Sequence, residues 1–409
     1  MAKHPALSVA SDALPLSIFA RLFERLARFE GDVVPFHIGD TYLAPPEASR
    51  LGALGFSTGD EPGLYQYSSP TGDTGLVDAL VDKVRRINRM SFAGSHSVQL
   101  TCGATHALSC SMRAVMDPSD EMLLLSPYWP LIRGIAKSCS VVPVEVPFGW
   151  DRLRQGGPVE VAAMIEPYIT ARTAAIYVCN PNNPDGKLLT GAELDAIVQV
   201  AVRHNLWVLA DEVYEHFIYD GLEHRSIATL PGMAERTLTA FSFSKSYGQA
   251  GLRAGYVVGP GDAVEAIRKM VNHTVYSVPR AVQRAAHAAL VGGDSFLDDA
   301  RERYQRARDL AAARVQAPCA VPQGCTYLFL DLGAWMGPND DCSLVGADGP
   351  SVLERIAEAG LLLAPGVAFG RAYGNWARLC FSSVPEPRLI EGIDRLNRAL
   401  EALPARVRP

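Results

Sequence analysis

The chain has 409 residues, 48% of them hydrophobic, so it is long enough to fold as two domains around a large core. Its net charge of -6 gives no basic surface for nucleic acid, and it contains no apolar run of about eighteen residues, the length that a membrane span needs. Composition therefore favours a small molecule as the partner.

Eight cysteines are scattered along the chain without a C-x-x-C pair, which is typical of reduced thiols in an intracellular protein. Nine histidines form no H-x-x-H pair, so we expect no metal site. The apolar stretch at residues 14–23 is interrupted by Pro15 and Arg21, unlike a secretory signal. Together these features predict a cytoplasmic protein.

The first hundred residues predict an N-terminal arm, a turn-rich segment and two helices. In the first helix, Ile18, Leu22, Leu26 and Phe29 fall on one face. Residues 33–38 form an apolar run that predicts a short strand, which ends before Gly39. Residues 63–75 are rich in glycine and tyrosine and predict turns. From Leu76 to Ile87, apolar residues recur with helical spacing and predict an amphipathic helix.

From residue 98 onward, short apolar segments alternate with helical ones. We expect strands at residues 98–101, 122–125, 141–146, 174–179, 206–210, 238–243 and 254–258. Continuously apolar strands are typical of a parallel sheet with helices on both faces. Because ligands of such sheets bind beyond the carboxyl ends of the strands, polar residues at these ends are site candidates.

After residue 279 the alternation stops, and the sequence predicts a separate α+β part. Helices are expected at residues 281–315, 351–359 and 388–403, and strands at 326–332 and 377–381. We therefore divide the chain into an N-terminal arm with part of the small domain (1–45), a large domain (46–290) and a C-terminal small domain (291–409).

The apolar run at residues 238–243 predicts a buried strand that ends on Ser244 and Lys245, and a glycine-rich turn with Arg253 comes after it. A lysine at the mouth of a buried strand is partly desolvated, which lowers its pKa toward that of a nucleophilic amine. Such an amine suits Schiff-base chemistry. Since Arg253 adds a fixed cation and Ser242 a hydroxyl, the three residues would suit an aldehyde that also bears a phosphate.

Polar side chains also end the neighbouring predicted strands. Asn183 lies on a proline-stiffened turn after residues 174–179, where an amide can donate to a phenolate oxygen. Asp211 and Tyr214 follow residues 206–210, and a carboxylate there can pair with a protonated ring nitrogen, as pyridoxal chemistry requires.

Two further strand ends offer a phosphate seat and a stacking surface. Gly103, Ala104 and Thr105 open a helix, whose free N–H groups and positive dipole end favour an anion. Trp129 follows the strand predicted at residues 122–125 and supplies an aromatic face for a ring.

Taken in order, N-P-N-N-P at 180–184, A-D-E-V-Y at 210–214 and S-F-S-K at 242–245 followed by Arg253 resemble the motifs of class I/II aminotransferases of the aspartate aminotransferase superfamily. The resemblance spans residues 39–378. It implies an α/β, fold-type I enzyme with a mostly parallel central sheet in a large domain and a smaller α+β domain. It also implies pyridoxal 5'-phosphate as the cofactor, an amino acid and a 2-oxo acid as substrates, and a homodimer with shared active sites.

The resemblance implies a role for each candidate that binds the cofactor. Lys245 corresponds to the Schiff-base lysine and proton-transfer base, Asp211 to the partner of the ring nitrogen, and Asn183 and Tyr214 to the donors to the 3'-oxygen. Trp129 corresponds to the stacking ring. The expected phosphate ligands are Gly103, Ala104, Thr105, Ser242 and Arg253.

Further matches concern the substrate and the partner subunit. Arg378 resembles the arginine that clamps the substrate's α-carboxylate, and Gly39 resembles a backbone donor beside it. Tyr67 resembles the tyrosine that reaches the phosphate in the neighbouring subunit. His273 stands where dicarboxylate-specific members have an arginine, and imidazole is a weaker, pH-dependent partner for a carboxylate. We therefore do not expect strict aspartate specificity.

The sequence departs from the family's pattern at Asp185, which stands before Gly186 where the family usually has threonine. This places an additional acid near the expected site, and the sequence gives no reason for it.

These features predict transamination by a ping-pong route. A lyase or cyclase of the aminocyclopropane-carboxylate-synthase or β-lyase type would use the same residues and is the main alternative. A non-catalytic regulator that binds the cofactor normally needs an attached DNA-binding domain, for which the N-terminal stretch is too short. Ser242-x-x-Lys245 also matches the S-x-x-K motif of serine acyl-transferases, but the chain has no S-D-N or K-T-G partner motif.

Overall fold

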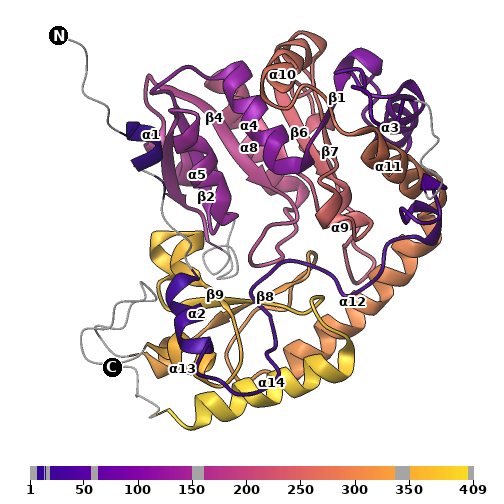
Figure 1. Cartoon of the computed structure of the whole chain (residues 1–409). Helices are drawn as coiled ribbons and strands as arrows, with labels where there is room; N and C mark the ends of the chain where they lie inside the picture. Colours follow the sequence, from indigo (N-terminus) through magenta and orange to yellow (C-terminus); the bar gives the residue numbers. More distant parts are fainter. Residues whose placement is uncertain are drawn as a thin grey trace.

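A computed structural model of the chain describes residues 7–12, 14, 19–56, 63–149, 161–336 and 351–403. The chain forms two lobes, each built on its own sheet, and α12 (Asp294–Arg314) runs along the outside from one lobe toward the other (Figure 1). Residues 15–18 of the interrupted apolar stretch lie outside the described residues.

The larger lobe contains a seven-stranded sheet in the order β1-β7-β6-β5-β4-β2-β3. Its strands are β1 (Val98–Thr101), β2 (Glu121–Ser126), β3 (Val142–Pro147), β4 (Thr173–Cys179), β5 (Trp207–Asp211), β6 (Thr237–Ser242) and β7 (Gly255–Val258). β7 pairs antiparallel with both neighbours, and every other pair of this sheet is parallel. The prediction of a mostly parallel sheet is thus confirmed.

Helices cover both faces of this sheet, because alternate side chains of each strand point to opposite sides. On one face, α4 (Gly103–Val115), α5 (Pro130–Ser138) and α10 (Gly261–Thr274) pack against residues such as Leu124. On the other face lie α3 (Thr74–Arg86), α7 (Val161–Ile165), α8 (Gly191–Arg203) and α11 (Arg280–Gly292). Leu123, the neighbour of Leu124 in β2, packs on this second face.

The smaller lobe contains an antiparallel sheet of β8 (Tyr327–Asp331), β10 (Trp376–Cys380) and β9 (Ala364–Pro365), with β10 in the centre. Around it pack α2 (Ala20–Leu26), α12, α13 (Val352–Glu358) and α14 (Glu386–Glu401), and their apolar residues form one buried cluster. Tyr214 and Phe217, which follow β5 of the larger lobe, belong to this cluster. The segment after β5 therefore packs into the smaller lobe.

One predicted feature of the N-terminal region is wrong, and the helix predicted at residues 76–87 is confirmed. Residues 33–38 form no strand, and only Val34 makes an isolated bridge, to Leu361. Pro35 explains this, because it has no N–H to continue the pairing. The amphipathic helix is present as α3, but it ends at Arg86, so Ile87 lies beyond it and is 46% exposed.

Three further observations concern only the described residues. No group of three His, Cys, Asp or Glu side chains among them is arranged to hold a metal ion. None of their helices combines the length and apolarity of a membrane span. Their seven cysteines are free thiols. The division into three domain ranges stays a prediction.

Candidate active site

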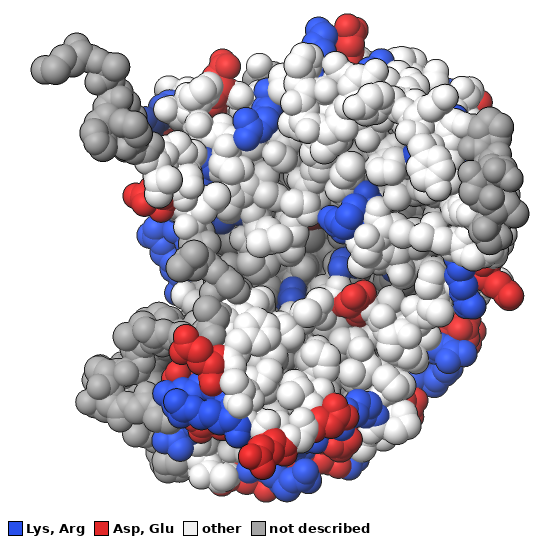
Figure 2. Space-filling model, in the orientation of Figure 1, with Lys and Arg blue, Asp and Glu red and all other residues white. Residues whose placement is uncertain are grey.

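A cavity of about 240 Å³ lies at the carboxyl ends of the central strands, between the two lobes. The space-filling view shows the molecule hollowed there, with basic side chains visible inside (Figure 2). Eleven of the predicted site residues line the cavity: Gly39, Ala104, Thr105, Trp129, Asn183, Asp211, Tyr214, Ser242, Lys245, Arg253 and Arg378. The structure therefore brings these predicted residues together around one cavity.

Lys245 lies one turn beyond its strand, in the short helix α9 (Phe243–Ser246), and not on the strand end as predicted. The chain turns into this helix because the Ser242 hydroxyl accepts a hydrogen bond of 3.1 Å from the Ser244 N–H, as an N-cap residue does. The Lys245 ammonium donates to the carbonyl oxygen of Gly39. Burial lowers the pKa of Lys245, which favours the free amine as the sequence predicted.

Asp211 ends β5, directly opposite Cys179 at the end of β4. Its Oδ2 accepts a hydrogen bond of 2.7 Å from the Tyr177 hydroxyl, and its Oδ1 accepts one of 3.4 Å from the Val213 N–H. Burial raises the pKa of Asp211 to about 6. A cation bound against this carboxylate would lower the pKa again and stabilise the charged pair.

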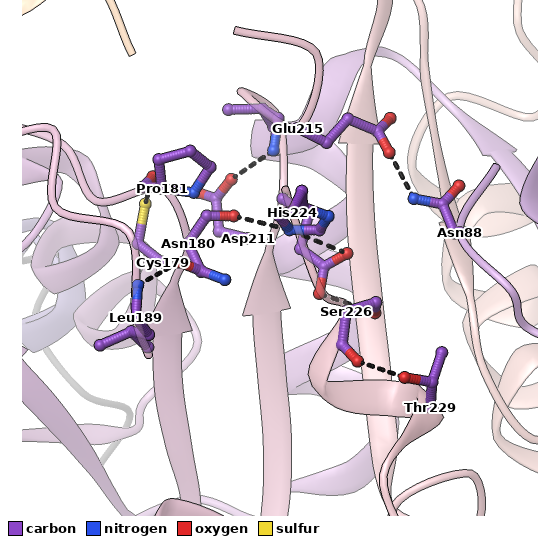
Figure 3. Close-up of polar contacts among 12 residues, drawn as sticks. Asn88, Cys179, Asn180, Pro181, Leu189, Asp211, Glu215, His224, Ser226 and Thr229 are labelled. Atoms are coloured by element: carbon purple, nitrogen blue, oxygen red, sulfur yellow. Dashed lines mark hydrogen bonds and ion pairs between the residues drawn. The ribbon is translucent and has the colours of Figure 1, made fainter. Parts of the chain in front are cut away.

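A second layer of buried polar groups lies behind Asp211 (Figure 3). Glu212 accepts a hydrogen bond of 2.8 Å from Ser226, and burial raises the pKa of Glu212 to about 8. Glu215 accepts hydrogen bonds from Lys83 and Asn88, both from the α3 region. Because Glu212 and Glu215 flank Tyr214 in the sequence, these bonds fix the segment that positions Asp211 and Tyr214.

One end of the cavity is suited to a phosphate. Ala104 and Thr105 lie in the first turn of α4, where backbone N–H groups have no partner within the helix. Arg253 has a left-handed backbone with φ of 60°, and its guanidinium approaches Gly103 so closely that a Cβ there would lie 2.6 Å from Nη2. Gly103, itself at φ of 80°, does not line the cavity but makes room for Arg253.

At the opposite end, Arg378 is held by two hydrogen bonds of 2.8 Å, from Nη1 to Asn183 Oδ1 and from Nη2 to the His37 carbonyl oxygen. Its guanidinium lies 4.1 Å from the centre of the Tyr327 ring and 5.1 Å from that of Phe369. Since Oδ1 of Asn183 is engaged by Arg378, the amide N–H groups of Asn183 remain to donate elsewhere in the cavity.

Tyr327 lines the cavity, and the sequence analysis missed it. Its hydroxyl is hydrogen-bonded to that of Tyr214. In the sequence it is an ordinary aromatic residue of a predicted strand, and only the pairing of β8 with β10 places it beside Arg378. The Tyr177 contact to Asp211 was missed for a similar reason, because Tyr177 lies within a buried apolar strand.

Besides Gly103, two predicted site residues do not line the cavity of their own chain. Tyr67 is 84% exposed and contacts the Tyr276 ring, and His273 is exposed near the end of α10. Asp185 also lies away from this cavity. Its Oδ1 accepts hydrogen bonds from Asn182 Nδ2 at 2.9 Å and from the Lys187 N–H at 3.2 Å, so it stabilises the turn that presents Asn183.

Comparisons with known proteins agree with this arrangement. The family described as aminotransferase class I and II matches residues 32–396. An aspartate/prephenate aminotransferase from Thermus thermophilus is 32% identical over 407 residues, covering 98% of this chain and 97% of that protein. Aromatic-amino-acid aminotransferase 2 from Thermococcus litoralis is 30% identical over 404 residues, covering 97% of this chain and 98% of that protein.

A solved structure extends the similarity to the fold. The crystal structure of the aspartate aminotransferase from Rhizobium meliloti matches with a TM-score of 0.86 at 26% identity, over 98% of this chain and 100% of that chain. The mixed α/β architecture is therefore that of fold type I. This chain belongs to the class I and II aminotransferases, enzymes that move an amino group between an amino acid and a 2-oxo acid.

Proposed function

We propose that the cavity binds pyridoxal 5'-phosphate and that Lys245 is the residue to which the cofactor is attached. The observation that carries this proposal is that one cavity joins a partly buried lysine, a buried carboxylate and two arginines. Arg253 with the first turn of α4 suits the phosphate, and Asp211 suits a protonated ring nitrogen. The residues present therefore fit the cofactor that the family implies.

When bound, pyridoxal phosphate supplies an aldehyde that accepts the amino group and a ring that delocalises charge from the substrate's Cα. Asp211 would keep the ring nitrogen protonated, and Asn183 and Tyr214 would donate to the ring oxygen. Trp129 would cover the ring face, and Ser242, Arg253, Ala104 and Thr105 would hold the phosphate. The amine of Lys245 would act as the base that moves the substrate's Cα proton.

Arg378 binds the α-carboxylate of the amino acid and of the 2-oxo acid in turn. Its rigid guanidinium is suited to two parallel hydrogen bonds with a carboxylate. Asn183 and the His37 carbonyl fix its orientation, and Gly39 places a backbone group beside the carboxylate. Lys245 lines the same cavity as this clamp.

The substitution Lys245→Ala tests the proposal. We expect the variant, reconstituted with pyridoxal phosphate, to lose both the cofactor's visible absorption band and its turnover. Lys269→Ala is the matched control, because Lys269 is a largely exposed lysine of α10 that pairs with Glu265. Retained turnover in Lys245→Ala would refute the assignment of Lys245.

We further propose that two copies of the chain form a dimer in which each Tyr67 completes the partner's phosphate site. Tyr67 is exposed, but its neighbour Ser68 is buried and donates a hydrogen bond of 2.8 Å to the Val278 carbonyl oxygen. Two further tyrosines are exposed nearby in the sequence. Tyr65, close to Tyr67, is 85% exposed, and Tyr276, close to Val278, is 43% exposed. Rigid backbone beneath exposed aromatic rings is what a protein interface requires.

Mixing two inactive variants tests this arrangement. In a hybrid dimer of Lys245→Ala and Tyr67→Ala chains, one site receives Lys245 from one chain and Tyr67 from the other. We therefore expect mixing to restore activity beyond the sum of the two variants. If Tyr67 acts within its own chain, or if the protein is a monomer, mixing restores nothing.

The position of His273 carries a proposal about the substrate's side chain. If α10 of one subunit reaches the partner's cavity, His273→Arg supplies a permanent cation there. We expect this variant to raise kcat/KM for aspartate relative to phenylalanine.

We also propose that the protein is cytoplasmic, because its cysteines are scattered as they are in proteins with reduced thiols.

A further inference from the structure

We infer that Tyr327 is a positioning residue that couples the two ends of the active site: its ring orients Arg378 and its hydroxyl directs the hydroxyl of Tyr214. The inference rests on the proposed function, because it assigns roles to residues around the proposed cofactor and substrate. Three contacts of Tyr327 support it, and each involves a residue that lines the cavity.

The first contact is with Arg378. Tyr327 begins β8 and pairs with Cys380 of β10, so it lies diagonally across the sheet from Arg378, on the same face. The guanidinium carbon of Arg378 lies 4.1 Å from the centre of the Tyr327 ring. Arg378 makes hydrogen bonds through Nη1 and Nη2, while its buried Nε has no partner among the described residues. The contact with the Tyr327 ring therefore helps to fix the plane of the Arg378 guanidinium, in addition to its two hydrogen bonds.

The second contact is with Tyr214. The two hydroxyls share one hydrogen bond, and the rings meet edge to face at 5.6 Å and 76°. One hydroxyl must donate and the other accept. If Tyr327 donates, the proton of Tyr214 is free to point into the cavity, toward the oxygen of the proposed cofactor. A hydroxyl that accepts one hydrogen bond is also a stronger donor in the next one.

The third contact is with Gly39. A Cβ on Gly39 would lie 1.9 Å from the Tyr327 hydroxyl oxygen, so any larger residue would displace that hydroxyl. The carbonyl of the same glycine accepts the hydrogen bond of the Lys245 ammonium. Gly39 therefore allows Tyr327, Tyr214 and Lys245 to meet.

The titratable and charged groups around Tyr327, Tyr214 and Lys245 decide whether the two tyrosine hydroxyls keep their protons. Arg378 of β10, Cys325 and Cys380 surround Tyr327 together with Tyr214. The charged neighbours of Lys245 are Asp40, Arg253 and Arg378. Burial raises the pKa of both tyrosines, so both hydroxyls keep their protons near neutral pH, as the shared hydrogen bond requires.

Two substitutions at Tyr327 separate the roles of its hydroxyl and its ring. Tyr327→Phe keeps the ring and removes the hydroxyl. We expect the pH midpoint of the cofactor's visible band to rise by roughly 0.2–0.5 units, because a weaker donor at Tyr214 leaves more charge on the ring oxygen. Tyr214→Phe should shift the midpoint further in the same direction, and the double variant should match Tyr214→Phe alone.

Tyr327→Leu removes the ring as well. For the amino acid that the unmodified enzyme turns over fastest in a panel of the twenty common ones, we expect KM to rise roughly tenfold, while Tyr327→Phe leaves it nearly unchanged. Thermal unfolding of the cofactor-free variants controls for misfolding. Gly39→Ala, which displaces the hydroxyl while keeping Tyr327, should reproduce the pH shift of Tyr327→Phe.

The possible results are distinguishable. A folded Tyr327→Phe variant with an unchanged midpoint, or a shift that adds to that of Tyr214→Phe, overturns the role of the hydroxyl. An equal KM in Tyr327→Leu and Tyr327→Phe overturns the role of the ring. If the unmodified protein forms no visible band and transfers no amino group, the proposed function itself fails, whatever the Tyr327 variants do.

Discussion

The Tyr177 hydroxyl donates a 2.7 Å hydrogen bond to Oδ2 of Asp211. Both residues are buried, Tyr177 within β4 and Asp211 at the end of the adjacent β5. This bond opposes the effect of burial, which raises the pKa of Asp211 to about 6. Tyr177 therefore helps to keep Asp211 ionised, in the form that a protonated ring nitrogen requires.

For Tyr177→Phe, we expect weaker binding of pyridoxal phosphate at mildly acidic pH. Loss of the hydrogen bond raises the pKa of Asp211 further, so more of the carboxyl is neutral at pH 6. A bond worth about 1 kcal/mol corresponds to a loss of roughly fivefold in affinity there, which should shrink at pH 8. Fluorescence titration with the cofactor at both pH values measures this. The control is Tyr128→Phe, which removes a buried tyrosine hydroxyl that donates to Glu145 and not to Asp211. An equal loss at both pH values, or the same loss in Tyr128→Phe, would contradict the explanation.

For Asp211→Asn, we expect the cofactor-free protein to become more stable while activity is lost. Because the pKa of Asp211 is raised from 3.8 to about 6 on folding, the folded chain holds a proton that the unfolded chain has released between these values. Stability therefore falls as pH rises through this window, by up to about 3 kcal/mol. Urea unfolding should show the variant equal to the unmodified protein below pH 4 and more stable above pH 6. A difference independent of pH would rule out titration of Asp211 as the cause.

For Lys83→Met, we expect a large loss of stability together with weaker cofactor binding. Lys83 and Glu215 form a buried ion pair, and removing one partner leaves the other charge uncompensated, at a cost of about 3–5 kcal/mol. Cofactor affinity should fall as well, since Glu215 follows Tyr214 directly. In the double variant Lys83→Met/Glu215→Gln the uncompensated charge of Glu215 is also removed. Urea unfolding should therefore show this variant to be more stable than Lys83→Met. A double variant no more stable than Lys83→Met would show that the pair is not the cause.

For Gly103→Ala, we expect cofactor affinity to fall at least about tenfold, with a smaller effect on stability. The new Cβ would lie 2.6 Å from Arg253 Nη2, and alanine at φ of 80° is strained by about 1 kcal/mol. Both effects disturb the proposed phosphate end. Gly292→Ala is the matched control, because nothing lies within 4 Å of its added Cβ. Equal affinities of the two variants for pyridoxal phosphate would contradict the assignment of Arg253.

Much of the fold was predictable, because each buried strand is a continuous apolar run bounded by polar or turn residues. The same pattern placed Asp211, Asn183 and Ser242 at strand ends, and parallel strands bring such ends to one edge. Lys245 was displaced by one turn, because the strand's apolar pattern does not reveal that the Ser242 hydroxyl starts a helix at Phe243.

Contacts between segments far apart in the sequence could not be predicted in this way. Tyr327 lies 51 residues before Arg378 and 113 residues after Tyr214, and it meets both only through the β8–β10 register and the packing of the two lobes. The strand predicted at residues 33–38 is absent for a local reason. The apolar pattern suits a strand, but Pro35 interrupts the pairing.

The most direct test of the central claim is the visible absorption of the purified protein, reconstituted with pyridoxal phosphate, before and after each of the common amino acids is added without any oxo acid. We predict a visible band that bleaches with particular amino acids, with release of an equal amount of the matching 2-oxo acid. The amino acids that bleach the band are the amino donors. A band that persists with every amino acid, or bleaching that releases an elimination or cyclisation product, would contradict transamination. The lack of any band after reconstitution would contradict the cofactor site at Lys245.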